Sequence, residues 1–403
     1  MAHYVVLGGL FVLSLITYVD RAAISSVKDP LGRDLGLSDQ QMGAVFSAFA
    51  LGYALAQIPA GWFADRFGPR AVLAAVVGLW SLLTAWTGWA GSLSSLLVIR
   101  FLFGVAEAGA FPGSARVFYN WLPRAEHGRA NGIIFSGSRI GAAGAFPLMA
   151  WLLSVLDWRT AFAALAVPGI AWAVIWYALF RDHPARPVPR EDPATEVAAP
   201  LADVFRTRGL WLAMAQYFAL NFTTFLCLTW MNPYLKSRYG LETPRAAFYS
   251  MIVLLLGATA QWVTGFAVDR LYASAGREWS RRGPAIVGFL LSAAGLAAIP
   301  GAATAEMAVV WFVVAAFGAE MTISPSWAYC LDVGKSKAGA VSGSMNMAGN
   351  IGSFVSANAF PYLQRATGGP GAYFYLVAAM SAASALCWLG MRSAGRPQKA
   401  VHH

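Results

Sequence analysis

The sequence predicts an all-α integral membrane protein with twelve transmembrane helices arranged as two six-helix bundles. Its 403 residues are 58% hydrophobic and only 12% charged, whereas soluble domains carry about a quarter charged residues. Apolar stretches of roughly 20 residues, enough to cross a bilayer, recur twelve times along the chain. A long polar stretch separates the first six from the last six. This composition argues against a soluble globular protein.

The expected transmembrane stretches contain several Gly and Pro residues. Helices tolerate these residues better in membranes than in water, so they do not interrupt the prediction. The stretches lie at 4–24, 41–63, 71–90, 94–119, 129–152, 159–180, 210–235, 245–268, 284–301, 305–330, 339–363 and 371–391.

The polar stretch at 181–208 defines the expected domain organisation. Its Pro and charge content is typical of a flexible linker. The two final histidines of the chain are typical of a purification-tag remnant. We expect an N-terminal six-helix bundle at 1–180, a cytoplasmic linker at 181–208, a C-terminal six-helix bundle at 209–392 and a cytoplasmic tail at 393–403.

Basic residues predict the orientation in the membrane. The loops after the second, fourth, sixth, eighth and tenth stretches, with the C-terminus, hold 18 of the 29 Lys and Arg residues, and the alternate loops hold 7. By the positive-inside rule, both termini are expected to be cytoplasmic. The net charge of +10 therefore reflects topology in a lipid bilayer, and no nucleic-acid partner is expected.

The two halves of the chain share a short motif. The second-to-third loop of the first half reads "GWFADRFGPR" (61–70), and the corresponding loop of the second half reads "GFAVDRLYAS" (265–274). Both contain Gly-x-x-x-Asp-Arg. Two halves of six helices in parallel orientation are typical of a secondary transporter built from repeats. We therefore expect the two bundles to be pseudo-symmetric.

The chain resembles the major facilitator superfamily over nearly its full length. The first of the two loops is similar to the signature cytoplasmic loop of that superfamily, in which an Asp and an Arg latch the two halves together. The resemblance implies the major facilitator fold and a cytoplasmic gate. The gate residues expected here are Gly61, Asp65, Arg66 and Arg70 in the first half, and Asp269 and Arg270 in the second.

A narrower resemblance is to the anion:cation symporter family. It rests on "RFLFGVAEAGAFPGSARVFYNWLPRAEHGRANGI" (100–133), "YVDR" in the first stretch and "GNIGS" in the eleventh. Members include bacterial permeases for galactonate, glucarate, hexuronates and tartrate, and animal transporters of sialic acid and glutamate. The resemblance implies proton-driven uptake of an organic anion across the bacterial inner membrane, by a carrier that works as a monomer.

Asp20 and Arg21 form an adjacent charged pair near the end of the first stretch. Neighbouring residues on a helix point about 100° apart, so only one of them can face a central cavity squarely. Tyr18 shares the stripe of Arg21, which assigns Arg21 to the cavity and Asp20 to a neighbouring helix of its own half. A guanidinium fork suits a substrate carboxylate, and the resemblance to galactonate-type permeases implies the same role. The alternative is a solvated helix end.

Arg100 and Glu107 lie seven residues apart in the fourth stretch. They share a helix face but are about 10.5 Å apart along the axis, so each needs another partner. The small apolar neighbours of Glu107 disfavour a buried charge and allow it to take a proton. The resemblance implies that Asp20 and Glu107 are the proton-coupling sites and that Arg100 modulates them. The alternatives are an interhelical hydrogen bond for Glu107 and a snorkelling side chain for Arg100.

Further polar residues in the stretches are candidate substrate contacts. Tyr18 and Tyr53 carry hydroxyls that suit a polyol or carboxylate, although aromatic residues in membrane helices usually serve packing. In the eleventh stretch Asn346 is expected in the cavity and Asn350 in helix packing, while the alternative is that both bridge helices. The tenth stretch supplies Ser324, Ser326 and Trp327.

The fifth stretch departs from the family pattern. Ser138 stands where galactonate-like members have a glutamine, and Arg139 follows it. Arg139 suits a second anionic group if it faces the cavity, and pairs with a nearby carboxylate if it faces sideways. The second half carries almost no charge within its expected stretches, which suggests coupling in the first half and selectivity in the second.

These residues favour a proton:organic-anion symporter with a sugar acid or related carboxylate as substrate. An exchanger or facilitator that uses the same Arg21 site is the alternative within transport. An enzyme or a sensor is disfavoured, because no histidine lies deep in an expected stretch and no soluble segment is long enough to signal. The scattered cysteines and histidines indicate no metal site, and no cofactor is expected.

Overall fold

The computed structural model describes residues 2–184, 201–273 and 277–391. The described residues are 91% helical, and no strand occurs among them. Most of the expected linker at 181–208 and the expected tail at 393–403 lie outside the described residues.

The first half of the chain forms eight α-helices and one 3₁₀ turn. Local signals explain several boundaries: Ser38 and Gln41 form a capping box at the start of α3, and Pro69 opens α4. The elements are α1 (Ala2–Ser26), α2 (Lys28–Leu35), α3 (Asp39–Phe67), α4 (Pro69–Thr87), α5 (Leu93–Glu107), α6 (Ala110–Trp121), η1 (Arg124–Glu126), α7 (His127–Val155) and α8 (Trp158–Leu179).

The second half forms a similar series. A π-helical turn, η3, joins α10 to α11 without ending the helix. The elements are α9 (Leu201–Arg206), α10 (Arg208–Phe225), η3 (Leu226–Trp230), α11 (Met231–Tyr239), α12 (Thr243–Ala273), α13 (Arg277–Ala298), η4 (Ile299–Gly301), α14 (Ala305–Met321), α15 (Ile323–Gly334), η5 (Lys335–Lys337), α16 (Ala338–Thr367) and α17 (Gly371–Gly390).

Ten helical stretches of the described chain are long and apolar enough to cross a membrane. They overlap eleven of the twelve expected stretches, because Ala305–Ser356 covers two of them. The expected stretch at 210–235 lies outside the ten, although α10, η3 and α11 make it helical. The chain is thus a multi-pass helical membrane protein.

Two of the expected stretches are broken helices. The fourth is divided between α5 and α6 at Ala108 and Gly109, and the tenth is divided between α14 and α15 at Thr322. Sequence periodicity does not predict these breaks, because apolar residues continue through both. Each break lies within two residues after a buried glutamate, Glu107 or Glu320, which makes the broken helices important for the site.

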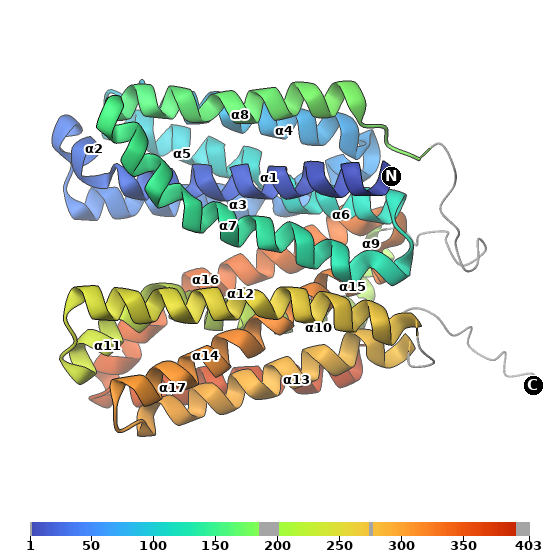
Figure 1. Cartoon of the computed structure of the whole chain (residues 1–403). Coiled ribbons are helices and arrows are strands. Elements are labelled where there is room, and N and C mark those ends of the chain that lie inside the picture. The colour runs from blue at the N-terminus through green and yellow to red at the C-terminus, as the bar shows by residue number, and fades with distance from the viewer. Residues whose placement is uncertain (1, 185–200, 274–276, 392–403) are drawn as a thin grey trace, which may run out of the picture.

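Helices α1–α8 lie on one side of the molecule and α10–α17 on the other (Figure 1). The start of α1 and the end of α17 lie at the same end, as do Asp65 and Asp269, and this end is hereafter the Asp65 end. The two sets of helices diverge toward the opposite end, where α2 and α11 lie. The contacts between the halves are made mainly by α3 with α16 and by α7 with α12.

Glycines allow the halves to approach closely near the Asp65 end. A Cβ on Gly61 would lie 2.2 Å from the carbonyl oxygen of Gly339 across the interface. One on Gly343 would lie 2.4 Å from the carbonyl oxygen of Gln57. Only glycine permits such backbone contacts between helices. A larger residue at either position would push α3 and α16 apart.

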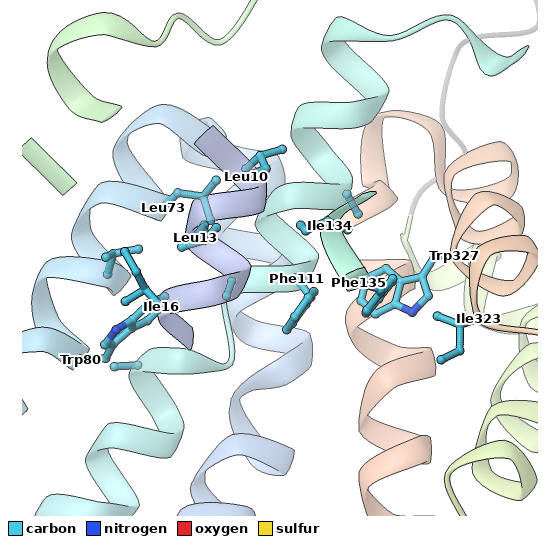
Figure 2. Packing of buried hydrophobic residues seen from close by; sticks show 14 of the residues in the cluster. Leu10, Leu13, Ile16, Leu73, Trp80, Phe111, Ile134, Phe135, Ile323 and Trp327 are labelled. Atoms are coloured by element: carbon cyan, nitrogen blue, oxygen red, sulfur yellow. The ribbon is translucent and has the colours of Figure 1, made fainter. Parts of the chain in front are cut away.

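Buried aromatic side chains also pack between the two halves. Phe111 and Phe135 of the first half stack with ring centroids 5.2 Å apart, and Trp327 of the second half lies 5.3 Å from Phe135. Figure 2 shows these three rings side by side, apart from the aliphatic packing of Leu10, Leu13 and Leu73 inside the first half. These rings pack the two halves against each other.

Candidate functional site

Arg21 lies at the centre of a charged and aromatic site in the first half. Its Nε donates to Oε1 of Glu107 at 2.7 Å. Its guanidinium lies over the rings of Tyr53, Tyr18 and Phe49, with centroids 4.3, 5.0 and 5.2 Å away. Its Nη2 is buried and has no hydrogen-bond partner among the described residues. The site therefore retains a buried donor that a ligand can satisfy.

Glu107 is fully buried and is the last residue of α5. One carboxylate oxygen accepts from Arg21, and Oε2 has no partner in the described part of the chain. The C-terminal end of a helix disfavours negative charge, so the ion pair with Arg21 is the main support for an ionised Glu107. Removing Arg21 from this contact would favour the protonated carboxyl.

Asp20 faces away from this pair, as the 100° separation predicts. Its Oδ2 accepts from the indole nitrogen of Trp80 on α4 at 3.1 Å, within the same half. Only 2% of Asp20 is exposed. Arg100 is also buried, and its guanidinium lies over the rings of Phe103 and Phe49 at 4.6 and 5.1 Å. The structure thus places Arg100 inside the protein and gives Glu107 a different ionic partner, Arg21.

Polar side chains of α3 and α16 meet across the interface beside Arg21. Asn346 donates through Nδ2 to Oε1 of Gln57 at 3.0 Å and to the hydroxyl of Tyr53 at 3.3 Å. Asn350 instead donates to the carbonyl oxygen of Asn346. Because Tyr53 also touches Arg21, this network connects the second half directly to the charged site.

The candidate residues of α15 lie at the same interface. The indole nitrogen of Trp327 donates to the hydroxyl of Tyr217 at 2.8 Å. The hydroxyl of Ser326 donates to the carbonyl oxygen of Thr322, and that of Ser324 is buried without a partner among the described residues. Trp327 therefore packs at the interface against Phe111 and Phe135 of the first half.

Ser138 and Arg139 point in different directions from α7. The hydroxyl of Ser138 is 2.6 Å from that of Ser14, inside the contact of α7 with α1. Arg139 crosses to the second half, where Nη2 donates to Oε1 of Glu320 on α14. The side chain of Gln261 on α12 donates to the other oxygen of Glu320. Arg139 thus pairs with a carboxylate, and this pair lies between the two halves of the chain.

Glu320 is the important residue that the sequence reasoning missed. The second half was expected to be almost free of charge within its membrane stretches, and that expectation is wrong because Glu320 is buried in α14. A signal for it exists in the sequence. Ala-Glu is followed five residues after the Glu by Pro in both halves, as Glu107 with Pro112 and as Glu320 with Pro325.

The shared Gly-x-x-x-Asp-Arg motif forms two contacts between the halves at the Asp65 end. Asp65 of α3 accepts from the backbone nitrogens of Gly339 and Ala340, at the start of α16. Asp269 of α12 accepts from the backbone nitrogens of Gly128 and Arg129, at the start of α7. A carboxylate is favourable at a helix N-terminus, where backbone N–H groups have no partner within the helix. Each half thus holds a helix of the other.

The basic residues of the motif take different places. Arg66 lies over the rings of Trp62 and Phe67 on the exposed side of α3, and Arg270 is exposed on α12. Arg70 donates through Nε to the carbonyl oxygen of Tyr177, inside the first half. None of these three arginines pairs with Asp65 or Asp269 in the described contacts, so the aspartates alone make the crossing hydrogen bonds of the motif.

Removing both carboxylates is expected to loosen the Asp65 end. Helix N-terminal contacts of this kind contribute about 0.5–2 kcal/mol each, so Asp65→Ala/Asp269→Ala should destabilise the closed contact by about 1–4 kcal/mol. Spin labels at exposed Phe67 and Trp279 should report a larger population at long distance. The matched variant Asp65→Asn/Asp269→Asn keeps acceptor oxygens and should change less. An unaltered distance distribution in the Ala variant would contradict the proposed role.

Membrane-length helices on two sides of a buried charged interface define a multi-pass membrane transporter. Among the described residues, no group of three or more His, Cys, Asp or Glu side chains could hold a metal ion. Residues 10–357 match the model of the Major Facilitator Superfamily. The chain belongs to this superfamily, and it is a transporter rather than an enzyme.

Similar proteins support this assignment and narrow the substrate. The chain is 32% identical to the probable sulfoacetate transporter SauU of Cupriavidus necator, over 96% of this chain and 93% of that protein. It is 30% identical to the probable L-galactonate transporter of Escherichia coli, over 88% and 80% of the two chains. These relatives confirm the resemblance to the anion:cation symporter family and indicate a transporter of organic anions.

Solved structures agree with the fold. The proton:xylose symporter XylE, bound to 6-bromo-6-deoxy-D-glucose, matches with a TM-score of 0.75 at 14% identity, over 96% of this chain and 95% of that one. The fucose:proton symporter FucP of Escherichia coli matches with a TM-score of 0.74 at 15% identity, over 96% and 98%. At such low identity, these structures support the fold alone.

Proposed function

We propose that the protein is a proton-coupled symporter that takes up a small organic anion, a sugar acid or related carboxylate, by alternating access. The observation that carries this proposal is the half-buried Arg21, which pairs with Glu107 and whose buried Nη2 has no partner among the described residues. The relatives named above are a probable sulfoacetate transporter and a probable L-galactonate transporter, which supports a small anion as the substrate.

Arg21 is the proposed anchor of the substrate carboxylate. A guanidinium offers parallel N–H donors that match the two oxygens of a carboxylate. Tyr18 and Tyr53 flank it, and Asn346 reaches it through the Tyr53 hydroxyl. Trp327, Ser324 and Ser326 form the nearby part of the second half. These hydroxyl and amide groups suit the hydroxyls of a sugar acid.

Competition for Arg21 supplies the coupling. Glu107 as a carboxylate occupies the guanidinium, whereas protonated Glu107 has no charge to hold it. A proton on Glu107 therefore frees Arg21 for the substrate, and substrate binding in turn favours the proton, because the two effects are linked. Asp20 is the second proposed proton site. The positive charge of Arg100 is proposed to modulate both Asp20 and Glu107. Neutralising these charges lets the loaded carrier change conformation without a buried unpaired charge.

The proposed topology has twelve crossings in two pseudo-symmetric six-helix bundles, at 1–180 and 209–392, and the protein works as a monomer. Both termini and the Asp65 end face the cytoplasm of a bacterium, and the chain lies in the inner membrane. In this orientation the contacts made by Asp65 and Asp269 close the cytoplasmic side. Alternating access then requires these contacts to open while the opposite end closes.

Uptake into liposomes tests the proposal. The purified protein is reconstituted, and uptake of radiolabelled galactonate, glucarate, gluconate and sulfoacetate is followed with the outside at pH 5.5 and the inside at pH 7.5. We expect at least one anion to accumulate above its outside concentration, and a protonophore to abolish that accumulation. Uptake that depends on an internal anion and ignores the pH gradient would instead indicate an exchanger. Uptake of none of these anions would contradict the proposal.

A further inference from the structure

We infer that Arg139 and Glu320 form a second anion subsite, in which the Glu320 carboxylate occupies the place of the second acidic group of a dianionic substrate. The inference rests on the proposed function, because it assumes that Arg21 binds the first acidic group. It narrows the substrate class to small organic dianions that reach from one arginine to the other.

The two Arg–Glu pairs occupy corresponding places in the two halves. Glu107 stands three residues before the start of α6, and Glu320 stands three residues before the start of α15. Each glutamate follows the same pattern, with a proline five residues later, and each pairs with an arginine from another helix. If one acidic group of the substrate displaces Glu107 from Arg21, a second acidic group can displace Glu320 from Arg139 in the same way.

A series of aromatic contacts runs from Arg21 to α7, the helix that carries Arg139. The guanidinium of Arg21 lies 5.0 Å from the ring of Tyr18, and Tyr18 is also within electrostatic reach of Arg139. The ring of Tyr18 contacts Phe111, which stacks on Phe135. Phe135 lies one helical turn before Arg139 on the same face of α7. Tyr18, Phe111 and Phe135 thus link the surroundings of Arg21 to the turn of α7 before Arg139.

Glu320 has room to move away from Arg139. A cavity of about 30 Å³, enough for one water molecule, borders both side chains. Its walls include the small residues Gly257, Ala316 and Ala319. Gln261 on α12 donates to the oxygen of Glu320 that Arg139 does not bind. A displaced Glu320 would therefore keep the Gln261 amide as a partner.

The charges of the site also fit a dianion. Arg21, Arg100 and Arg139 are balanced by Asp20, Glu107 and Glu320 when all six are ionised. The proposed function places protons on Asp20 and Glu107, which leaves two positive charges in excess. A dianion restores neutrality, whereas a monoanion leaves one uncompensated charge inside the membrane, which is unfavourable.

Binding of matched anions to the purified full-length protein tests the inference. Titration calorimetry compares pairs that differ in one acidic group: glucarate with gluconate, malonate with acetate, and sulfoacetate with acetate. The wild type should bind at least one dianion more tightly than its monoanion partner. Arg139→Gln should weaken that dianion by about tenfold or more, as expected for the loss of a charge-assisted hydrogen bond, and should weaken the monoanion far less.

Two further variants address folding and displacement. Arg139→Gln/Glu320→Gln leaves no buried unpaired charge and should show the same loss of dianion preference. Glu320→Gln removes the internal competitor and should strengthen dianion binding. Arg245→Gln breaks the exposed Arg245–Glu306 pair, which joins the same two helices, α12 and α14, as the Gln261–Glu320 hydrogen bond. This control should leave the dianion preference as it is.

The outcomes separate the inference from the proposed function. If the wild type binds anions without preferring any dianion, or if Arg139→Gln weakens both members of a pair equally, the second subsite is wrong while Arg21 is unaffected. A dianion preference that is lost equally in Arg245→Gln would also overturn the inference. If no anion binds the wild type at all, the proposed function itself is wrong.

Discussion

Arg21→Ala is expected to abolish binding of the organic anion while the helices remain folded. The variant removes the only guanidinium that both pairs with Glu107 and keeps a buried donor free among the described residues. Two charge-assisted hydrogen bonds to a carboxylate are worth about 3 kcal/mol, which corresponds to a factor of about 150 in Kd. Calorimetry on the purified variant measures this loss directly.

The fold should survive this substitution because Glu107 can respond to the loss of its partner. A buried carboxylate without a cation takes up a proton instead of remaining charged. Circular dichroism and the melting temperature in detergent check this point. Arg21→Lys is the informative companion, because it keeps the charge but loses the planar fork. We expect it to bind the anion with intermediate affinity.

A matched control tests whether the effect is specific to the site. Arg206→Ala removes an exposed arginine from α9, whose side chain is 84% exposed. It changes the net charge by the same amount and should leave anion binding unaltered. If Arg21→Ala binds the anion as the wild type does, Arg21 has no role as the anchor and the proposed site must be abandoned.

The orientations of the Asp20 and Arg21 side chains could be predicted from the sequence, because they depend on one helix alone. The 100° step between Asp20 and Arg21 and the three-residue spacing from Tyr18 are local properties of α1. In the structure Asp20 accepts a hydrogen bond from Trp80, and the ring of Tyr18 lies beside Arg21. The separation of about 10.5 Å that excludes a direct pair between Arg100 and Glu107 also follows from the geometry of one helix.

The partners of Arg139 and Ser138 could not be predicted in the same way. Ser138 meets Ser14 and Arg139 meets Glu320 because of how α7 is rotated between α1 and the second half. That rotation is set by close contacts such as Gly141 against the backbone of Leu15. Contacts between helices far apart in the chain leave no periodic signal. Only the repeated Ala-Glu pattern hinted at Glu320.

The Asp65 and Asp269 contacts show what a sequence repeat can and cannot reveal. The repeat identified both aspartates as corresponding residues, and the resemblance suggested a latch. It did not reveal that each one binds backbone N–H groups at the start of a helix in the other half. Backbone groups have no sequence signature, so a contact with a helix start is visible only when the three-dimensional arrangement is known.

Glu107→Gln is expected to uncouple transport from the pH gradient while leaving anion exchange measurable. Gln fills nearly the same volume but neither binds a proton nor forms an ion pair with Arg21. Arg21 would then be available to the anion at every pH. One proton across a gradient of one pH unit supplies about 1.4 kcal/mol, enough for about tenfold accumulation. The variant should therefore accumulate the anion to about its outside concentration only.

The comparison with Asp20→Asn separates the two proposed proton sites. Glu107 contacts Arg21 directly, whereas Asp20 faces Trp80, so only Glu107 competes with the substrate for the guanidinium. We therefore expect anion binding to lose its pH dependence in Glu107→Gln and to retain it in Asp20→Asn, while gradient-driven uptake falls in both. Calorimetry at pH 5.5 and 7.5 and liposome uptake measure these two properties. If Glu107→Gln still accumulates the anion against its gradient, proton coupling does not pass through the Arg21–Glu107 pair.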